Sequence, residues 1–263
     1  ALPSFEGKAM TAKPVTEPNS ISIKPYNQST DSKKDQVARM FDGISGRYDL
    51  LNRLLSMGID VRWRRVALRM LREQGQPKRV LDVATGTADL ALALAADLPQ
   101  AEVIGVDISE GMLEVGRQKV ERNGLHPRVR LDQADAENLP FEDHSFDAVT
   151  VAFGVRNFEN LDNGLRELQR VLRPGGHLMV LEFSKPTSPL IKGAMNLYSR
   201  SLMPALGGWL SKDRAAYAYL PASVQVFPEG AAFEERLSRA GLQPLRQRRL
   251  SMGISSVYIA RKG

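Results

Sequence analysis

Acidic residues end three successive apolar runs between residues 80 and 135, and a glycine turn follows the first of them. The first run ends in Asp82 and continues into a turn whose single glycine is Gly86. The next two runs lead to Asp107 and Asp135. Open α/β sheets bind ligands beyond the carboxyl ends of their parallel strands. We therefore expect the three carboxylates to face one binding site.

The glycine turn does not match a phosphate-binding loop. A dinucleotide-binding turn reads G-x-G-x-x-G, whereas Ala84, Gly86 and Asp89 occupy those positions here. Asp89 would repel a pyrophosphate at the helix N-terminus, and the turn has no Walker-type lysine. The pattern favours a cationic cofactor without phosphates, as S-adenosylmethionine is.

Six residues form the predicted cofactor site: Asp82, Gly86, Thr87, Asp107, Asp135 and Ala136. Gly86 lets the backbone approach the ligand closely, and Thr87 offers a hydroxyl. Asp107 is expected to bind both ribose hydroxyls, as an acid does at the equivalent strand end of dinucleotide folds. Asp135 is expected to reach the adenine amine, with backbone from Ala136, and Asp82 to supply negative charge. Capping of the following helix or turn is the alternative for each aspartate taken singly.

Alternating strands and helices must position these residues. Residues 1–30 carry four prolines and no apolar period, which predicts a disordered or extended tail. Spacings of three and four from Lys33 onward predict a helical cap within 31–77. Short apolar runs then alternate with helical stretches as far as the run HLMVLEF, which is typical of an open sheet with helices on both faces.

The last part of the chain departs from that alternation and returns to it. Residues 186–228 are apolar, aromatic and too long for a plain connection, so a helical insertion on the substrate side is expected. A final helix and two strand-like runs complete a single α/β domain over 31–263.

Composition restricts the classes of protein that fit. The 263 residues include no cysteine, which excludes disulfides and thiolate sites and fits the cytoplasm. No apolar run reaches the roughly 18 residues of a membrane span, and three scattered histidines offer no metal-ligand spacing. The net charge of +6 indicates an anionic partner or a solvated basic face. The late basic residues are Arg236, Arg239, Arg246, Arg248, Arg249, Arg261 and Lys262.

Several stretches resemble the successive motifs of class I methyltransferases that use S-adenosylmethionine. These are LDVATGTADL, GVDIS, DAENLPFEDHSFDAVT and LRPGGHLMVLEFSKP. YDLLNRLLSMGIDVRWRR (48–65) and RVLRPGGHLMVLEFSKP (170–186), with AFGVRNF (152–158) between them, are similar to signatures of the ubiquinone/menaquinone-biosynthesis C-methyltransferases. The resemblance runs from about Asp35 to the C-terminus. It implies a Rossmann-like seven-stranded sheet whose last strand is antiparallel, and methylation of a ring carbon of a polyprenylated benzoquinol or naphthoquinol.

Methylation of a ring carbon requires that carbon to become nucleophilic, which deprotonation of a neighbouring hydroxyl achieves. A phenol has a pKa near 10, so the site must remove that proton or stabilise the anion. Arg156 follows the fourth predicted strand and is assigned to stabilising the quinolate. Asn157 and Tyr48 are candidates to orient the hydroxyl. An ion pair that holds a loop is the alternative for Arg156, and core packing for Tyr48.

The insertion and the cap are expected to enclose the polyprenyl tail. Asp213, Tyr217 and Tyr219 are the candidates to face the substrate. A quinol with such a tail lies in the bilayer, so peripheral contact with the inner face of an anionic membrane is expected. A homodimer is a further expectation. The cap looks more like that of bacterial menaquinone enzymes, which favours demethylmenaquinol.

Three rival classes remain beside this hypothesis. A nucleic-acid methyltransferase would carry a basic stripe interleaved with aromatics, and the segment AFGVRNF has neither this nor a base-amine motif, so no nucleic-acid partner is expected. An NAD-dependent oxidoreductase is disfavoured by Asp89. A non-catalytic component of a quinone-synthesis complex is the third.

Overall fold

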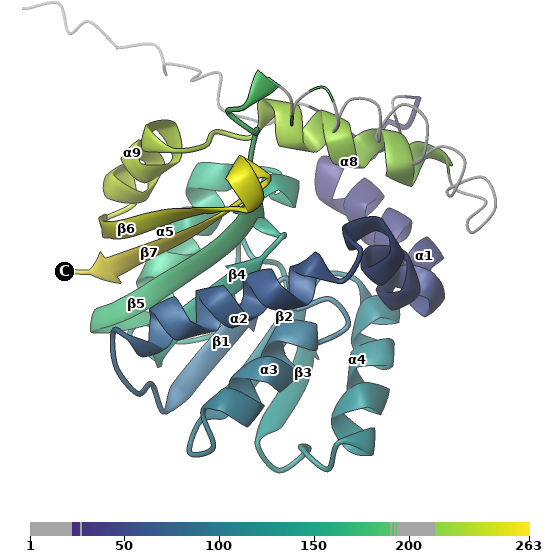
Figure 1. Cartoon of the computed structure of the whole chain (residues 1–263). Coiled ribbons are helices and arrows are strands. Elements are labelled where there is room, and N and C mark those ends of the chain that lie inside the picture. Colours follow the sequence, from purple (N-terminus) through teal and green to yellow (C-terminus); the bar gives the residue numbers. More distant parts are fainter. Residues whose placement is uncertain (1–22, 27, 190, 192, 194–213) are drawn as a thin grey trace, which may run out of the picture.

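The chain's structure, a computed structural model, describes residues 23–26, 28–189, 191, 193 and 214–263. Most of the predicted N-terminal tail and part of the predicted insertion lie outside these residues. Figure 1 shows a central sheet with helices on both sides and further helices across its upper edge.

Seven strands form one sheet in the order β3-β2-β1-β4-β5-β7-β6. Their bounds are β1 Arg79–Val83, β2 Glu102–Asp107, β3 Val129–Gln133, β4 Phe146–Ala152, β5 Leu172–Phe183, β6 Leu242–Leu250 and β7 Ser255–Lys262. The pairs β5–β7 and β6–β7 are antiparallel and the other pairs are parallel. The expected seven-stranded sheet with an antiparallel last strand is confirmed. β5 starts five residues before the predicted run at His177, because Leu172 already pairs with Phe146 before the register shifts.

Helices cover both faces, as predicted. Their bounds are α1 Lys33–Ser56, α2 Ile59–Arg72, α3 Asp89–Asp97, α4 Glu110–Arg122, α5 Leu161–Val171, α8 Arg214–Val226 and α9 Ala231–Arg239. Two short 3-10 turns are η1 Val155–Asn157 and η3 Ser251–Gly253. Side chains of α2, α3 and α4 share one buried cluster with the sheet, and those of α5 and α9 share another. The sheet is therefore the middle of three layers.

Alternation along each strand separates the two cores. In β1, Val80 belongs to the cluster under α2, α3 and α4, whereas Leu81 and Val83 belong to the cluster under α5 and α9. All three side chains are fully buried. A strand buried on both faces reads as a continuous apolar run, so polar residues are left for the strand ends.

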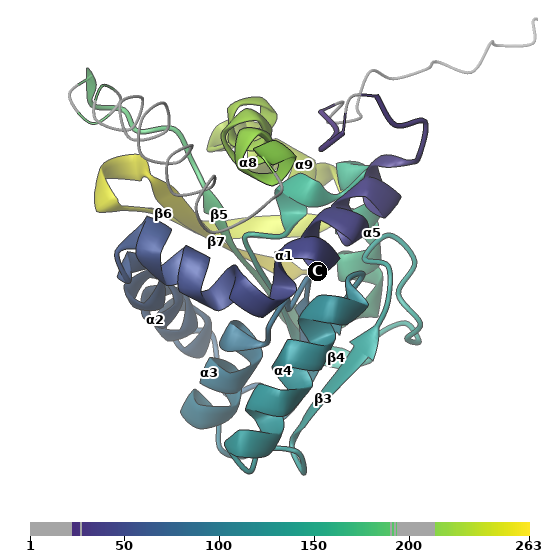
Figure 2. The same cartoon turned by 90° about the vertical axis from the view of Figure 1, so that its right-hand side faces the viewer.

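Helix α1 crosses the carboxyl edge of the sheet, above α4 in Figure 2. Asp42 Oδ1 accepts hydrogen bonds from Ser109 Oγ at 2.6 Å and Gly111 N at 2.9 Å, at the start of α4. About two turns later, Asp49 accepts from Thr87 Oγ1 at 2.6 Å and from Lys119 Nζ at 2.9 Å. Of the predicted helical cap, α1 therefore covers the strand ends, whereas α2 packs on a face of the sheet.

Candidate active site

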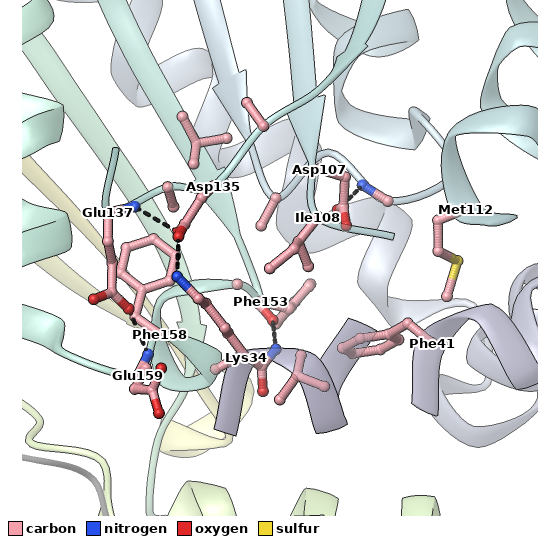
Figure 3. Close-up of a pocket in the computed structure, with 18 of the residues that line it drawn as sticks. Lys34, Phe41, Asp107, Ile108, Met112, Asp135, Glu137, Phe153, Phe158 and Glu159 are labelled. Atoms are coloured by element: carbon pink, nitrogen blue, oxygen red, sulfur yellow. Dashed lines mark hydrogen bonds and ion pairs between the residues drawn. The ribbon is translucent and has the colours of Figure 1, made fainter. Parts of the chain in front are cut away.

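A cleft of about 720 Å³, counted to its open mouth, lies between the carboxyl ends of the strands and α1. Predicted site residues that line it are Tyr48, Gly86, Asp107, Asp135, Ala136 and Asn157. Figure 3 shows Asp107 and Asp135 on the sheet side, with Lys34 and Phe41 of α1 facing them.

Asp107 ties the glycine turn to the second strand. Its carboxylate accepts from Gly86 N at 2.8 Å and from Ser109 N at 2.9 Å. Burial raises the pKa of Asp107, and these backbone hydrogen bonds oppose the rise. Gly86 has a φ of 57°, a left-handed conformation that costs glycine little. The predicted pair of glycine and acid is therefore in place at the cleft.

Asp135 is bound by a lysine that the sequence did not reveal as a site residue. Lys34 Nζ lies 2.8 Å from Asp135 Oδ2, and Glu137 N donates to Asp135 Oδ1 at 2.9 Å. The hydrogen bond to Asp135 raises the pKa of Lys34. The first turn of α1 thus occupies the carboxylate predicted to bind an adenine amine.

The cleft is acidic overall. Its lining includes four carboxylates, Asp107, Asp135, Glu137 and Glu159, against Lys34 as the single lysine or arginine among the described lining residues. Such an excess attracts a cation and repels phosphates. The chemistry of these groups fits a sulfonium cofactor.

Asp82 and Thr87, both among the predicted cofactor residues, lie behind the cleft rather than in its lining. Asp82 is 1% exposed and accepts from Thr85 Oγ1 at 2.6 Å and Thr150 Oγ1 at 2.7 Å. Thr87 is also buried and donates to Asp49 of α1. Neither lines the cleft. Both side chains instead fix the backbone that carries Gly86.

Arg156 is buried just behind the cleft and forms an ion pair. Its Nη1 lies 2.7 Å from Glu182 Oε1, with both side chains almost fully buried, and also donates to the carbonyl oxygen of Phe153. The guanidinium carbon lies 5.3 Å from the Phe183 ring centre. Glu182, which stands in the apolar run HLMVLEF, is not among the predicted site residues. The alternative role of Arg156 is an ion pair that holds a loop. The Nη1 edge of its guanidinium does form such a pair.

Three buried polar atoms without partners gather around this pair. Among the described residues, four buried side-chain polar atoms lack a hydrogen bond, and three of them are Arg156 Nε, Asn157 Oδ1 and Tyr219 OH. Leaving a buried polar group unpaired costs about 1–3 kcal/mol, so such atoms call for an explanation. Asn157 lines the cleft, and the Tyr219 hydroxyl is close enough for Arg156 and Glu182 to affect its pKa. Arg156 and Asn157 are neighbours in η1, and α8, which carries Tyr219, packs against η1. The three unpartnered atoms are called the unused polar site.

The tyrosines differ in their placement. Tyr48 lines the cleft and packs edge-on against Phe41, and burial raises its pKa. Tyr219 packs with Val37 and Met40, and burial raises its pKa to about 12. Asp213 and the side chain of Tyr217 lie outside the described residues. None of the three histidines lines the cleft.

The whole α/β domain matches known proteins. The model of the ubiE/COQ5 methyltransferase family matches residues 29–262. A demethylmenaquinone methyltransferase of Bacteroides fragilis is 47% identical over 91% of this chain and 97% of its own length. A ubiquinone/menaquinone biosynthesis C-methyltransferase UbiE of Syntrophotalea carbinolica is 46% identical over 89% of this chain and 95% of its own. A SAM-dependent methyltransferase structure from Aquifex aeolicus shares the fold, with a TM-score of 0.56 at 19% identity over 75% of this chain and 89% of its own.

The raised pKa of Asp82 predicts that the free energy of unfolding depends on pH. Burial raises its pKa from 3.8 to about 6, so folding favours the protonated carboxyl, and this contribution is lost as pH rises through about 6. Asp82→Asn keeps the shape without the charge. We expect the free energy of unfolding of the variant minus that of the wild type to rise by about 3 kcal/mol between about pH 4 and pH 7. Urea unfolding at both pH values measures it, and a difference that does not change with pH would refute the assignment.

Proposed function

Because the chain belongs to the ubiE/COQ5 methyltransferase family, we propose that it transfers the methyl group of S-adenosylmethionine to a ring carbon of a polyprenylated quinol. Demethylmenaquinol is the favoured acceptor, given the relatives named for it at up to 47% identity. Relatives whose name includes ubiquinone biosynthesis, at 46% identity, keep a benzoquinol as the second candidate. The observation that carries the proposal for this chain is the acid-lined cleft beside three unpartnered buried polar atoms.

The cleft supplies what the cofactor requires. Asp107, Asp135 and Ala136 all line the cleft. We assign the Asp107 carboxylate to the ribose hydroxyls, and Asp135 with Ala136 to the adenine. The carboxylates favour the positive sulfur, and Gly86 leaves room beside the turn. When bound, S-adenosylmethionine supplies an electrophilic methyl group. The protein must then hold an electron-rich ring carbon of the acceptor next to that methyl group.

We assign the unused polar site to binding the oxygen of the acceptor ring. The Arg156 guanidinium stays protonated at any relevant pH, and it stabilises the negative oxygen of a quinolate through its free Nε edge. Asn157 Oδ1 and the Tyr219 hydroxyl complete the unpartnered atoms at this site. Tyr48 lies on the cleft side, in α1, where it orients the ring. A hydroxyl with a lowered pKa loses its proton more readily. The resulting oxygen anion then makes the adjacent ring carbon nucleophilic.

Peripheral membrane contact follows from the substrate, since a polyprenyl chain partitions into lipid. No helix among the described residues is long and apolar enough to cross a membrane. The late basic residues do not form one free cationic face, because Arg236 pairs with Asp162 and Lys262 is buried against backbone carbonyls. A homodimer is also proposed, and its molecular mass by light scattering would check it.

The acceptor is identified by incubating the protein with methyl-labelled S-adenosylmethionine and either reduced demethylmenaquinol or a short-chain benzoquinol. We expect the label on a ring carbon of the naphthoquinol, located by mass spectrometry of the product. Label on the benzoquinol alone would reverse the choice of substrate. Label on neither ring, with tight uptake of NAD instead, would refute the proposal.

Glu182 and Arg156 are expected to affect turnover rather than cofactor binding. Glu182→Gln removes the charge that fixes the guanidinium, and Arg156→Gln removes the guanidinium itself. We expect kcat to fall about tenfold in the first variant and about 100-fold or more in the second, by analogy with the loss of an oxyanion donor. The Kd for S-adenosylmethionine, measured by calorimetry, should stay within about twofold.

Asp162→Asn is the matched control, because it breaks the ion pair between Asp162 of α5 and Arg236 of α9, neither of which lines the cleft. Its kcat should equal that of the wild type. Equal turnover by Arg156→Gln and the wild type would contradict the assigned role. Parallel loss of kcat and cofactor binding in both site variants would mean that the pair only maintains the fold.

Lys34 is expected to limit cofactor affinity. Lys34→Met frees Asp135 and makes the cleft more negative. Because this ion pair is partly exposed, we expect the affinity for S-adenosylmethionine to rise by no more than about fivefold. The gain should be smaller for the uncharged product, S-adenosylhomocysteine. Arg39→Met, which removes another α1 ion pair, with Asp31, is the control, and a weaker affinity in Lys34→Met would instead make Lys34 a ligand.

A further inference from the structure

Exposed apolar side chains gather where α1 passes into α2. Among the described residues, eight large hydrophobic side chains are exposed, and five of them fall within residues 50–61. These five are Leu50, Leu54, Met57, Ile59 and Val61. Leu50, Leu54 and Met57 follow the spacing of four and three that places side chains on one side of a helix. Met57, at the end of α1, is 79% exposed.

A sixth exposed side chain joins them from far along the chain. Trp63 of α2 donates from Nε1 to Ser251 Oγ at 2.8 Å, which holds η3 beside the first turns of α2. The next residue, Met252, is 67% exposed and has a φ of 55°. A left-handed conformation is strained for methionine, and here it accompanies an outward apolar side chain. The six residues together are called the α1–α2 corner.

Three arginines close in sequence to this corner form no ion pair with another described residue. They are Arg53, Arg62 and Arg65, and all three are exposed. The two acids of residues 47–65 are already bound, because Asp49 lies 2.9 Å from Lys119 and Asp60 lies 2.7 Å from Arg64. The surface therefore combines apolar side chains with uncompensated positive charge. That combination is typical of protein segments that lie in the headgroup region of anionic membranes.

We propose that the α1–α2 corner is the surface by which this protein docks on an anionic lipid bilayer. The inference rests on the proposed function, because a polyprenylated quinol would have to enter from the bilayer. Helix α1 carries both Phe41 and Tyr48, which line the cleft, and the apolar residues that follow them. Docking through the corner thus brings α1, and the cleft beneath it, to the membrane surface.

Charge favours a lipid over a second copy of the chain. A two-fold dimer through this corner would place the same patch against itself, and would bring Arg53, Arg62 and Arg65 close to their own copies. Like charges without counter-ions oppose such a contact. An anionic leaflet instead supplies the counter-charge and accepts the apolar side chains.

The proposal is tested by co-sedimentation of the full chain with vesicles of equal parts phosphatidylglycerol and phosphatidylcholine. We expect the double variant Leu54→Asp/Met57→Asp to lower the partition coefficient at least about tenfold, since two apolar side chains are lost from the interface. Each of Arg53→Gln, Arg62→Gln and Arg65→Gln should lower it about fivefold. High salt should release the wild type and have less effect on the arginine variants.

Two exposed residues of β6 provide matched controls. Leu245→Asp and Arg248→Gln change the same kinds of side chain on the edge strand, and they should leave the partition coefficient unchanged. Equal binding by the corner variants and the wild type would overturn the proposal, as would equal losses in the β6 controls. A lower oligomeric mass of Leu54→Asp/Met57→Asp by light scattering, with lipid binding retained, would assign the corner to a second copy and also overturn it.

A second readout separates this surface from the proposed function. Methylation of a short-chain, water-soluble quinol should be the same for Leu54→Asp/Met57→Asp and the wild type, whereas methylation of a long-chain quinol embedded in the anionic vesicles should fall with binding. A wild type that binds vesicles through the corner but methylates neither quinol would refute the function and leave the docking surface standing.

Discussion

The buried ion pair between Arg156 and Glu182 is the interaction on which the rest of the site depends. A buried pair returns little net stability, but removal of one partner leaves an uncompensated charge and is costly. Here the pair joins the turn after β4 to the end of β5, two neighbouring strands. It fixes one edge of the guanidinium and leaves Nε without a partner. A folded chain therefore carries a preorganised cation next to an acidic cleft, which is the arrangement that a reaction through a ring-oxygen anion requires.

Helix α1 connects this pair to the cofactor end of the cleft. Lys33 Nζ donates to the carbonyl oxygens of Arg156 at 3.1 Å and Phe158 at 2.7 Å, and burial lowers its pKa to about 8. The neighbouring Lys34 reaches Asp135, and Asp42 and Asp49 hold the starts of α4 and α3. One helix thus contacts the turn that carries Arg156, Asp135 beyond the end of β3, and the starts of α3 and α4. Any movement of α1 that admits a ligand must break several of these bonds together.

The sequence was sufficient for the parts of the site that depend on local pattern. Apolar runs that end in acids correctly located Asp107 and Asp135 at the cleft, because parallel strands bring their carboxyl ends to one edge. The turn also holds two alanines, Ala84 and Ala88, in the left-handed conformation that glycine adopts at little cost, with φ of 54° and 65°. The direction in which Asp82 turns depends on Thr150, 68 residues later. Likewise Lys34 meets Asp135 across 101 residues, so no local spacing could reveal that contact.

The proposed reaction depends on one interaction, in which an arginine fixed by a buried glutamate stabilises the oxygen anion of the acceptor ring. The most direct measurement is an absorbance titration of a naphthol that is already methylated on the ring carbon and therefore unreactive, bound together with S-adenosylhomocysteine. We predict that the pKa of the bound naphthol lies at least one unit below that of the free compound, which is about 1.4 kcal/mol of anion stabilisation. An unchanged or raised pKa of the bound naphthol would contradict the claim.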